Sequence, residues 1–198
     1  MLYDELASHG LEIIAISLDE HLDAARFCAR EETTVPLTYT VLIDRDHAWA
    51  EAYGVINIPT SIWVDEDDRL VRPPSIAPAD DKFKDFSGVE SAIHHDALRR
   101  WVVDGVEPMS ESDFAARKQP PTFELQLARA ERRLAMYLLR EGHEEAGNAH
   151  LARALELAPD DWTIHRGSMP VRGLDPFGQD FFDFYERWQA AGRPGYAS

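Results

Sequence analysis

Cysteine is almost missing from this chain of 198 residues, which contains Cys28 alone. A single cysteine cannot close a disulfide within the chain or supply a zinc site built from several thiolates. An excess of basic residues is missing as well, because 20 lysines and arginines stand against 36 acidic residues and the net charge is −16. Nucleic acid and anionic membranes attract clustered positive charge, so we expect neither as a partner.

Long apolar runs are also missing. No stretch approaches the ~20 residues that cross a bilayer, so we predict no membrane segment. The first five residues, MLYDE, lack the basic start and apolar stretch of a signal peptide. Together with the single free cysteine, this predicts a reducing, cytoplasmic location, unless a missing N-terminal segment carries a signal.

Apolar strands and amphipathic helices alternate in the first half of the chain. We expect strands over residues 11–18, 39–43 and 61–64, the last returning through an acidic turn at 65–68 into a strand that starts at Leu70. Helices are expected after Asp19, after Asp44 and over 96–103, and a surface loop over 73–88. This order predicts an α/β domain over residues 1–106.

The second half of the chain, residues 107–198, is predicted to be mainly helical. Residues 107–122 are expected to form a linker, because Pro120 and Pro121 stop helix continuation. Helices are expected over 123–141 and 144–157, which form a helical hairpin over 123–161. Residues 162–198 are an aromatic-rich tail in which only 181–188 is expected to be helical.

The segment YGVINIPTS, residues 53–61, resembles the thioredoxin-like superfamily, and the run VLID at 41–44 resembles redoxins of the TlpA/ResA type, which are related to AhpC/TSA proteins. The resemblance implies a thioredoxin-like fold, a cis peptide bond before Pro59, and a substrate-facing loop formed by Ile58, Pro59 and Thr60. Asp68 departs from the family, which often has glycine in that hairpin turn. Pro-Thr at 59–60 argues against a peroxiredoxin, whose corresponding loop usually offers valine and a catalytic arginine.

The redox-active centre of that family is absent from the sequence. In the family a strand ending in Trp-Cys-x-x-Cys precedes the helix that would end here at Leu6. Disulfide exchange needs one thiolate to attack and a second thiol to resolve the mixed disulfide. We therefore predict no catalytic residue in this chain. Cys28, beside Phe27 in an expected helix, is interpreted as a small packed side chain, and a nucleophilic Cys28 is the less favoured alternative.

The missing strand would be the central one of the sheet, between the strands at 11–18 and 61–64. Its loss leaves two apolar strands with open facing edges, which is costly and favours aggregation. Three explanations remain: the chain is a fragment or a mis-started version of a longer protein, the two strands pair directly, or a strand from elsewhere fills the gap. We favour the first, because Met1 falls inside an expected helix.

Residues 128–161 resemble one tetratricopeptide repeat. Aligned back from Pro159, the small and apolar consensus positions are occupied by Leu134, Ala135, Leu138, Gly147, Leu151 and Ala154. A stable array needs about three repeats, so we expect this hairpin to dock on the redoxin-like domain rather than to form a peptide groove.

Metal and cofactor sites are not predicted. His94 and His95 are adjacent and are interpreted as an exposed polar pair, and residues 65–68 as a solvated turn without calcium-loop spacing. Two hypotheses follow. The chain is the cysteine-free part of a thiol–disulfide oxidoreductase and is itself redox-inactive, with a protein or a thiol/disulfide compound as substrate. Alternatively, it is a non-catalytic module that binds a partner protein through residues 58–60 and the helical tail.

Overall fold

A computed structural model describes residues 2–19, 38–82, 84–117 and 120–195. Its first strands are β1 (Ile14–Ser17) and β2 (Thr40–Ile43), which run parallel with Ile14 opposite Thr40. A parallel pair requires a crossover between its strands, and the helix expected there after Asp19 lies outside the described residues. Before β1 lie α1 (Leu2–Leu6) and the 3₁₀ turn η1 (Ala7–His9). The mixed composition of strands and helices confirms the α/β class.

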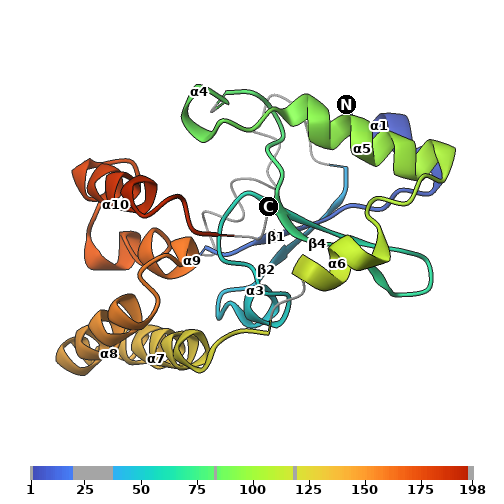
Figure 1. Ribbon diagram of the computed structural model, residues 1–198. Helices are drawn as coiled ribbons and strands as arrows, with labels where there is room; N and C mark the ends of the chain where they lie inside the picture. The colour runs from blue at the N-terminus through green and yellow to red at the C-terminus, as the bar shows by residue number, and fades with distance from the viewer. Residues whose placement is uncertain (1, 20–37, 83, 118–119, 196–198) are drawn as a thin grey trace.

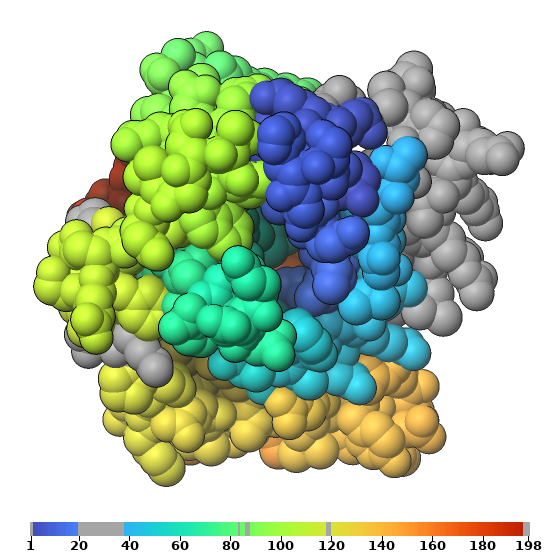
Figure 2. Space-filling model, turned by 90° about the vertical axis from the view of Figure 1, so that its right-hand side faces the viewer, coloured from blue at the N-terminus to red at the C-terminus, as the bar shows by residue number. Residues whose placement is uncertain are grey.

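The second pair of strands is an antiparallel hairpin of β3 (Thr60–Val64) and β4 (Leu70–Ile76), with Trp63 opposite Arg72. Within the described ranges, β1 pairs with β2 and β3 with β4, and the two pairs form separate two-stranded sheets. Direct pairing of the strands expected at 11–18 and 61–64 is therefore not found. Figure 2 shows a hollow in the surface between the blue N-terminal residues, the yellow-green helices and the green hairpin.

Helices cover the strands from two sides. In Figure 1, α1 and α5 (Ser91–Asp104) lie on one side of the strands, and α3 (Ala48–Ala52) and α7 (Phe123–Arg140) on the other. The side with α5 is held by an apolar cluster in which Leu6, Trp63 and Leu98 are buried. A further short helix, α4 (Lys84–Ser87), precedes α5. The prediction of a surface loop over residues 73–88 is therefore wrong in part, since this segment contains the end of β4 and helix α4.

The expected linker at 107–122 contains a helix, α6 (Glu111–Arg117), which packs against β4. Ser110 explains its start, since the Ser110 Oγ accepts a hydrogen bond from the Asp113 N–H at 3.1 Å and donates to the Asp113 carboxylate at 2.6 Å. Ser110 thus acts as the N-cap of α6, and Ser-x-x-Asp is the corresponding helix-start signal in the sequence. The prolines that follow end α6 but do not prevent it.

The C-terminal half consists of α7, α8 (Glu144–Leu157), α9 (Trp162–His165), the 3₁₀ turn η2 (Pro170–Arg172) and α10 (Gln179–Ala190). α7 and α8 match the predicted helices and pack against one another. Thr122 caps α7 by accepting from the Leu125 N–H at 3.1 Å. α10 extends the helix expected at 181–188, and buries Phe181 and Phe184 against Trp162. The aromatic residues of the tail thus form a core of their own.

No helix among the described residues has the length and apolar character needed to span a membrane.

Candidate functional site

The loop that joins α3 to β3 is the candidate site. α3 ends at Ala52 with Tyr53 as its C-cap, and Gly54 then adopts φ +72°, a left-handed conformation that suits glycine. The Ile58–Pro59 peptide is cis, as the resemblance implies. The Thr60 hydroxyl donates to the Asn57 backbone oxygen at 2.6 Å, which closes the turn around the cis bond. The loop therefore has a fixed shape just before β3 begins.

Ile58, Pro59 and Thr60 lie together at this turn. The Ile58 side chain is 43% exposed and Pro59 is exposed, whereas Thr60 is half-buried. The Pro59 carbonyl accepts from the Ala77 N–H at 3.2 Å, so the turn is tied to the end of β4. An exposed apolar side chain on a fixed turn is a suitable contact for another molecule. Of these three residues Thr60 alone carries a hydroxyl, and that hydroxyl donates to the Asn57 carbonyl.

The helical tail contacts the same loop. The Trp162 N–H, at the start of α9, donates to the Ile56 carbonyl at 2.9 Å. Asp161 caps α9 by accepting from the N–H groups of Thr163 and Ile164, and burial raises the pKa of its carboxyl. Sequence reasoning expected the tail to dock on the domain but did not predict which residues make the contact.

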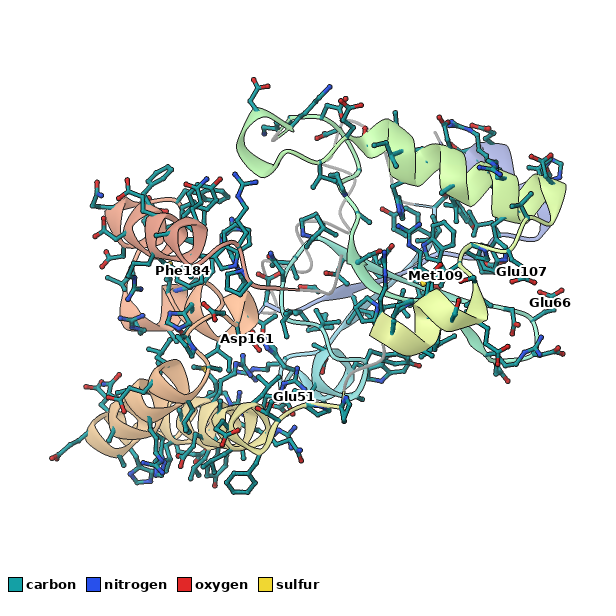
Figure 3. The ribbon with its side chains drawn as sticks, in the orientation of Figure 1. Glu51, Glu66, Glu107, Met109, Asp161 and Phe184 are labelled. Atoms are coloured by element: carbon teal, nitrogen blue, oxygen red, sulfur yellow. The ribbon has the colours of Figure 1, made fainter. Side chains whose placement is uncertain are left out.

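A second contact joins α3 to α7, and we refer to it as the α3–α7 interface, formed by Asp46, His47, Glu51, Arg129, Arg132 and Arg140. Arg129 donates to the Glu51 backbone oxygen at 3.1 Å, and Arg140 pairs with Asp46 at 2.9 Å. Figure 3 shows Glu51 on α3 where it faces the C-terminal helices, with Asp161 nearby at the start of α9. Burial raises the pKa of Glu51, against the opposing effect of the arginines around it.

His47 is the buried centre of this interface. It adopts φ 58°, and only 2% of it is exposed. Its Nε2 lies 2.9 Å from the Arg132 Nη2 and 3.1 Å from the Leu18 carbonyl oxygen. One ring nitrogen cannot accept from the guanidinium and donate to the carbonyl at once, so these contacts compete. Burial and then the Arg132 charge lower the pKa of His47 to about 3, which keeps the ring neutral.

The interpretation of His94 and His95 as an exposed pair is wrong, because both side chains are half-buried. Helix α5 begins five residues earlier than expected, at Ser91, and this places the His94 ring 5.4 Å from the ring of Trp63. His94 is half-buried, and burial lowers its pKa to about 4. The aromatic contact could not be predicted, because it joins α5 to β3 in space.

The turn at 65–68 is the tight hairpin turn that the sequence predicts. Asp65 accepts from the N–H groups of Asp67 and Arg69, at 3.0 and 2.9 Å. Asp68 takes the left-handed conformation with φ 60°, which aspartate tolerates better than most residues. The departure from glycine at this position therefore leaves the turn intact.

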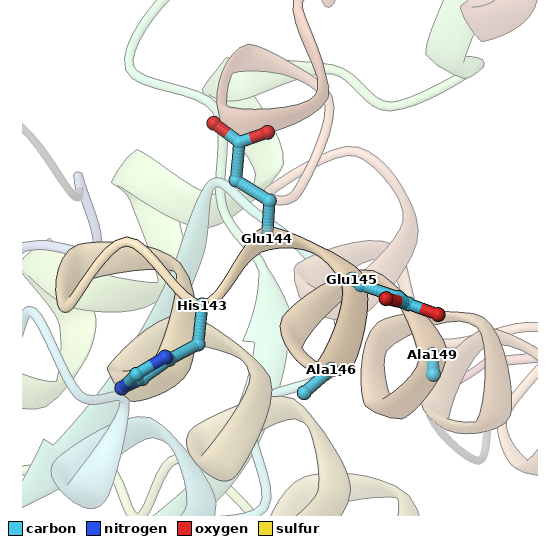
Figure 4. Close-up of a pocket in the computed structure, with 5 residues that line it drawn as sticks. All are labelled: His143, Glu144, Glu145, Ala146 and Ala149. Atoms are coloured by element: carbon cyan, nitrogen blue, oxygen red, sulfur yellow. The ribbon is translucent and has the colours of Figure 1, made fainter.

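Metal-binding clusters of histidine, cysteine and acidic side chains are not found in the described parts of the chain. A hollow of about 520 Å³ lies beside the start of α8, and Figure 4 shows that the side chains of His143, Glu144 and Glu145 point away from one another there. A second, of about 450 Å³, lies along α7 by Arg133 and Tyr137. Neither hollow brings reactive groups together.

Cys28 and Phe27, which the sequence analysis discusses, lie outside the described residues.

Comparison with known proteins agrees with the resemblance. A family model described as the AhpC/TSA family matches residues 1–72. Peroxiredoxin Bcp of Escherichia coli K12 is 30% identical over 100 residues, which cover 50% of this chain and 61% of that protein. A putative peroxiredoxin bcp of Shigella flexneri aligns with the same identity and coverage. The matched region thus spans less than two thirds of the length of these relatives. No solved structure matches the chain.

These relatives are named as peroxiredoxins, so the comparisons do not support the argument from Pro59 and Thr60 that sets the chain apart from peroxiredoxins. They do confirm the broader prediction, a thioredoxin-like fold of the redoxin type in the N-terminal part of the chain. The matches do not bear on the tetratricopeptide-like interpretation of α7 and α8, which stays a prediction.

Proposed function

We propose, from the match of residues 1–72 to the AhpC/TSA family and the similarity to peroxiredoxins, that the chain is the substrate-loop part of a redoxin and that by itself it does not carry out thiol–disulfide exchange. The observation that carries the proposal is the exposed turn at Ile58 and Pro59, held by its hydrogen bonds to Thr60 and Ala77. Such a turn offers a partner chain an apolar contact and a fixed backbone.

The chemistry of thiol–disulfide exchange supports the proposal that this chain is inactive by itself. An attacking thiolate forms a mixed disulfide with one sulfur of the substrate and releases the other as a thiolate, and a second thiol then resolves the mixed disulfide. Cys28 is the one thiol in the sequence, so the chain by itself cannot supply both sulfurs. Reduction of a hydroperoxide by a lone thiolate would likewise leave a sulfenic acid that needs an external thiol.

The test is an activity assay of the chain with dithiothreitol as reductant, once with insulin disulfide and once with hydrogen peroxide as substrate. We expect the rates to equal those of dithiothreitol alone. Cys28→Ser is the matched control, and it should leave both rates unchanged. Turnover above the background that Cys28→Ser abolishes would contradict the proposal and make Cys28 a nucleophile.

A second function, a non-catalytic binding module, is favoured by the contact of Trp162 with the loop at Ile56. That contact places the helical tail beside the proposed binding turn, where both could face one partner. Sequencing the coding region upstream of Met1 and expressing any extended frame discriminates the two. A Cys-x-x-Cys in that extension, together with insulin reduction by the extended protein, favours the redoxin. An extended frame without that motif favours the binding module.

A further inference from the structure

A cluster of cationic and aromatic side chains surrounds Trp63, away from the loop at Ile58. The Arg72 guanidinium lies over the Trp63 ring, with its carbon 4.7 Å from the ring centre. Trp101 stacks on the same ring at 5.3 Å, and His94 meets it edge-on at 5.4 Å. Packing fixes Trp63 between β4 and α5, so Arg72 is held in place by a rigid platform.

Arg117 brings a second guanidinium to this place from the last turn of α6, which packs against β4. Figure 1 shows α6 beside the β4 arrow. Burial and then the charge of Arg117 lower the pKa of Arg72, which shows that the two guanidinium groups lie within electrostatic reach. Two like charges brought together in this way repel one another unless an anion lies between them.

Acidic partners are found for neither arginine among the described residues. This is unusual in a chain with 36 acidic residues and a net charge of −16. Arg69, three positions before Arg72, shows the ordinary arrangement, because it pairs with Asp65 and Asp67 at 2.9 and 3.0 Å. The cluster around Trp63 is therefore a local concentration of uncompensated positive charge.

Three polar atoms of the cluster are enclosed without a hydrogen-bond partner: the Arg72 Nε, the His94 Nδ1 and the Ser75 Oγ. Ser75 stands opposite Ser61, whose hydroxyl accepts from the Trp63 Nε1 at 3.2 Å, so its hydroxyl belongs to the same part of the hairpin. Buried donors without partners are costly, and a bound ligand can lower that cost.

We propose that Arg72 and Arg117 form a binding site for a doubly charged oxyanion of the phosphate type, with Ser75 and His94 at its border. Guanidinium groups match the oxygens of such an anion in shape and charge, and two of them balance its two charges. The anion would sit between β4 and α6 and would link these elements. This inference does not depend on the proposed redox function, because it uses none of residues 56–60.

The experiment is calorimetric titration of the full chain with sodium phosphate, with sodium chloride adjusted to keep the ionic strength constant. We expect saturable binding, and a loss of affinity of about tenfold or more in Arg117→Gln. Arg69→Gln is the matched control, since it removes one arginine of the same hairpin outside the cluster, and it should bind phosphate as the unchanged chain does. Acetate, with one charge, should bind more weakly than phosphate.

Arg72→Gln also removes packing against Trp63, so its thermal midpoint is measured beside its affinity. Loss of phosphate binding with an unchanged midpoint in Arg117→Gln supports the site even if Arg72→Gln unfolds. The proposal is overturned if phosphate does not saturate the unchanged chain, if Arg117→Gln and Arg69→Gln bind equally well, or if acetate binds as tightly as phosphate.

Discussion

The Trp162 N–H and the Ile56 carbonyl oxygen are 2.9 Å apart, and their hydrogen bond fastens the start of α9 to the loop that precedes Pro59. The Trp162 ring meanwhile lies among Phe181, Phe184 and Trp188, with ring centres 4.8 to 5.9 Å away. One residue therefore joins the aromatic core of the tail to the proposed binding turn.

Replacement of this residue tests the aromatic part of the connection, because alanine keeps the backbone N–H that donates to Ile56. Trp162→Ala should destabilise the chain by about 3–5 kcal/mol, the usual cost of removing a large buried aromatic side chain. Urea unfolding followed by circular dichroism measures it. Phe182→Ala in the same aromatic tail is the control, because Phe182 is exposed, and it should cost well under 1 kcal/mol. Equal losses in the two variants would show that Trp162 is not the anchor.

Removal of Arg132 tests the α3–α7 interface. Arg132 is 1% exposed and contacts the His47 ring. We expect Arg132→Ala to lower the free energy of unfolding by about 1–3 kcal/mol, because the change removes the packed stem of Arg132 and takes a hydrogen-bond partner from the neutral His47 ring. Arg153 is exposed and pairs with Glu131 on the outside of the hairpin, so Arg153→Ala should cost at most about 1 kcal/mol. An Arg132→Ala variant as stable as Arg153→Ala contradicts a structural role for this interface.

Acid should destabilise the fold through His47. Its pKa falls from an ordinary value of 6.5 to about 3 on folding, so between these pH values the unfolded chain binds a proton that the folded chain does not. The stabilising effect is complete above pH 6.5 and is lost as the pH falls, by at most ~1.4 kcal/mol per pH unit. Urea unfolding at pH 7, 6 and 5 measures this slope.

The control for that slope is His47→Asn, since asparagine tolerates the left-handed backbone conformation at this position. His94 and His165, each with a pKa lowered to about 4 by burial, give slopes of the same sign. Glu51 and Asp161 oppose them, because their raised pKa values make stability fall as the pH rises. The variant should therefore flatten the slope without removing it, and an unchanged slope would show that His47 does not titrate as described.

Gly147 lies where α8 passes close to Leu139 of α7. A Cβ at this position would lie 2.7 Å from the Leu139 Cγ. Gly147→Ala should therefore destabilise the hairpin by about 1–3 kcal/mol despite the better helix propensity of alanine. The double variant with Leu139→Ala relieves that clash, so it should lose less than the sum of the two single changes. Simple additivity in thermal unfolding would contradict the close contact.

The sequence predicted the elements with strong local signals. The apolar runs at 11–18, 39–43 and 61–64 correspond to β1, β2 and β3. The two long segments with helical periodicity correspond to α7 and α8. The sequence does not predict α6, because Pro120 and Pro121 indicate a linker, although Ser110 and Asp113 carry a helix-start signal. It does not predict the first turn of α5 either, because Asp96 is itself a favourable helix cap.

The candidate site was predicted in part. Residues 58–60 were found from the resemblance, and the cis bond agrees with it. The contacts of His47 with Arg132 and of Arg72 with Trp63 could not be predicted, because neither residue belongs to a local motif. The pairing of Arg72 with Trp63 depends on the hairpin register, which shifts at Trp63. The lowered pKa of His47 could not be predicted either, because it depends on how deeply the folded chain buries the ring.

The α3–α7 interface also affects the order in which the chain folds. Its hydrogen bonds join residues 78, 85 and 94 positions apart, whereas the pairing of α7 with α8 closes over a short turn. Long loops cost entropy before their contacts are made, so the hairpin should assemble early and attach to the α/β domain late. Contacts that form after the transition state chiefly slow unfolding. The buried arginines should then mainly slow unfolding. Arg132→Ala should therefore accelerate unfolding and leave the folding rate nearly the same.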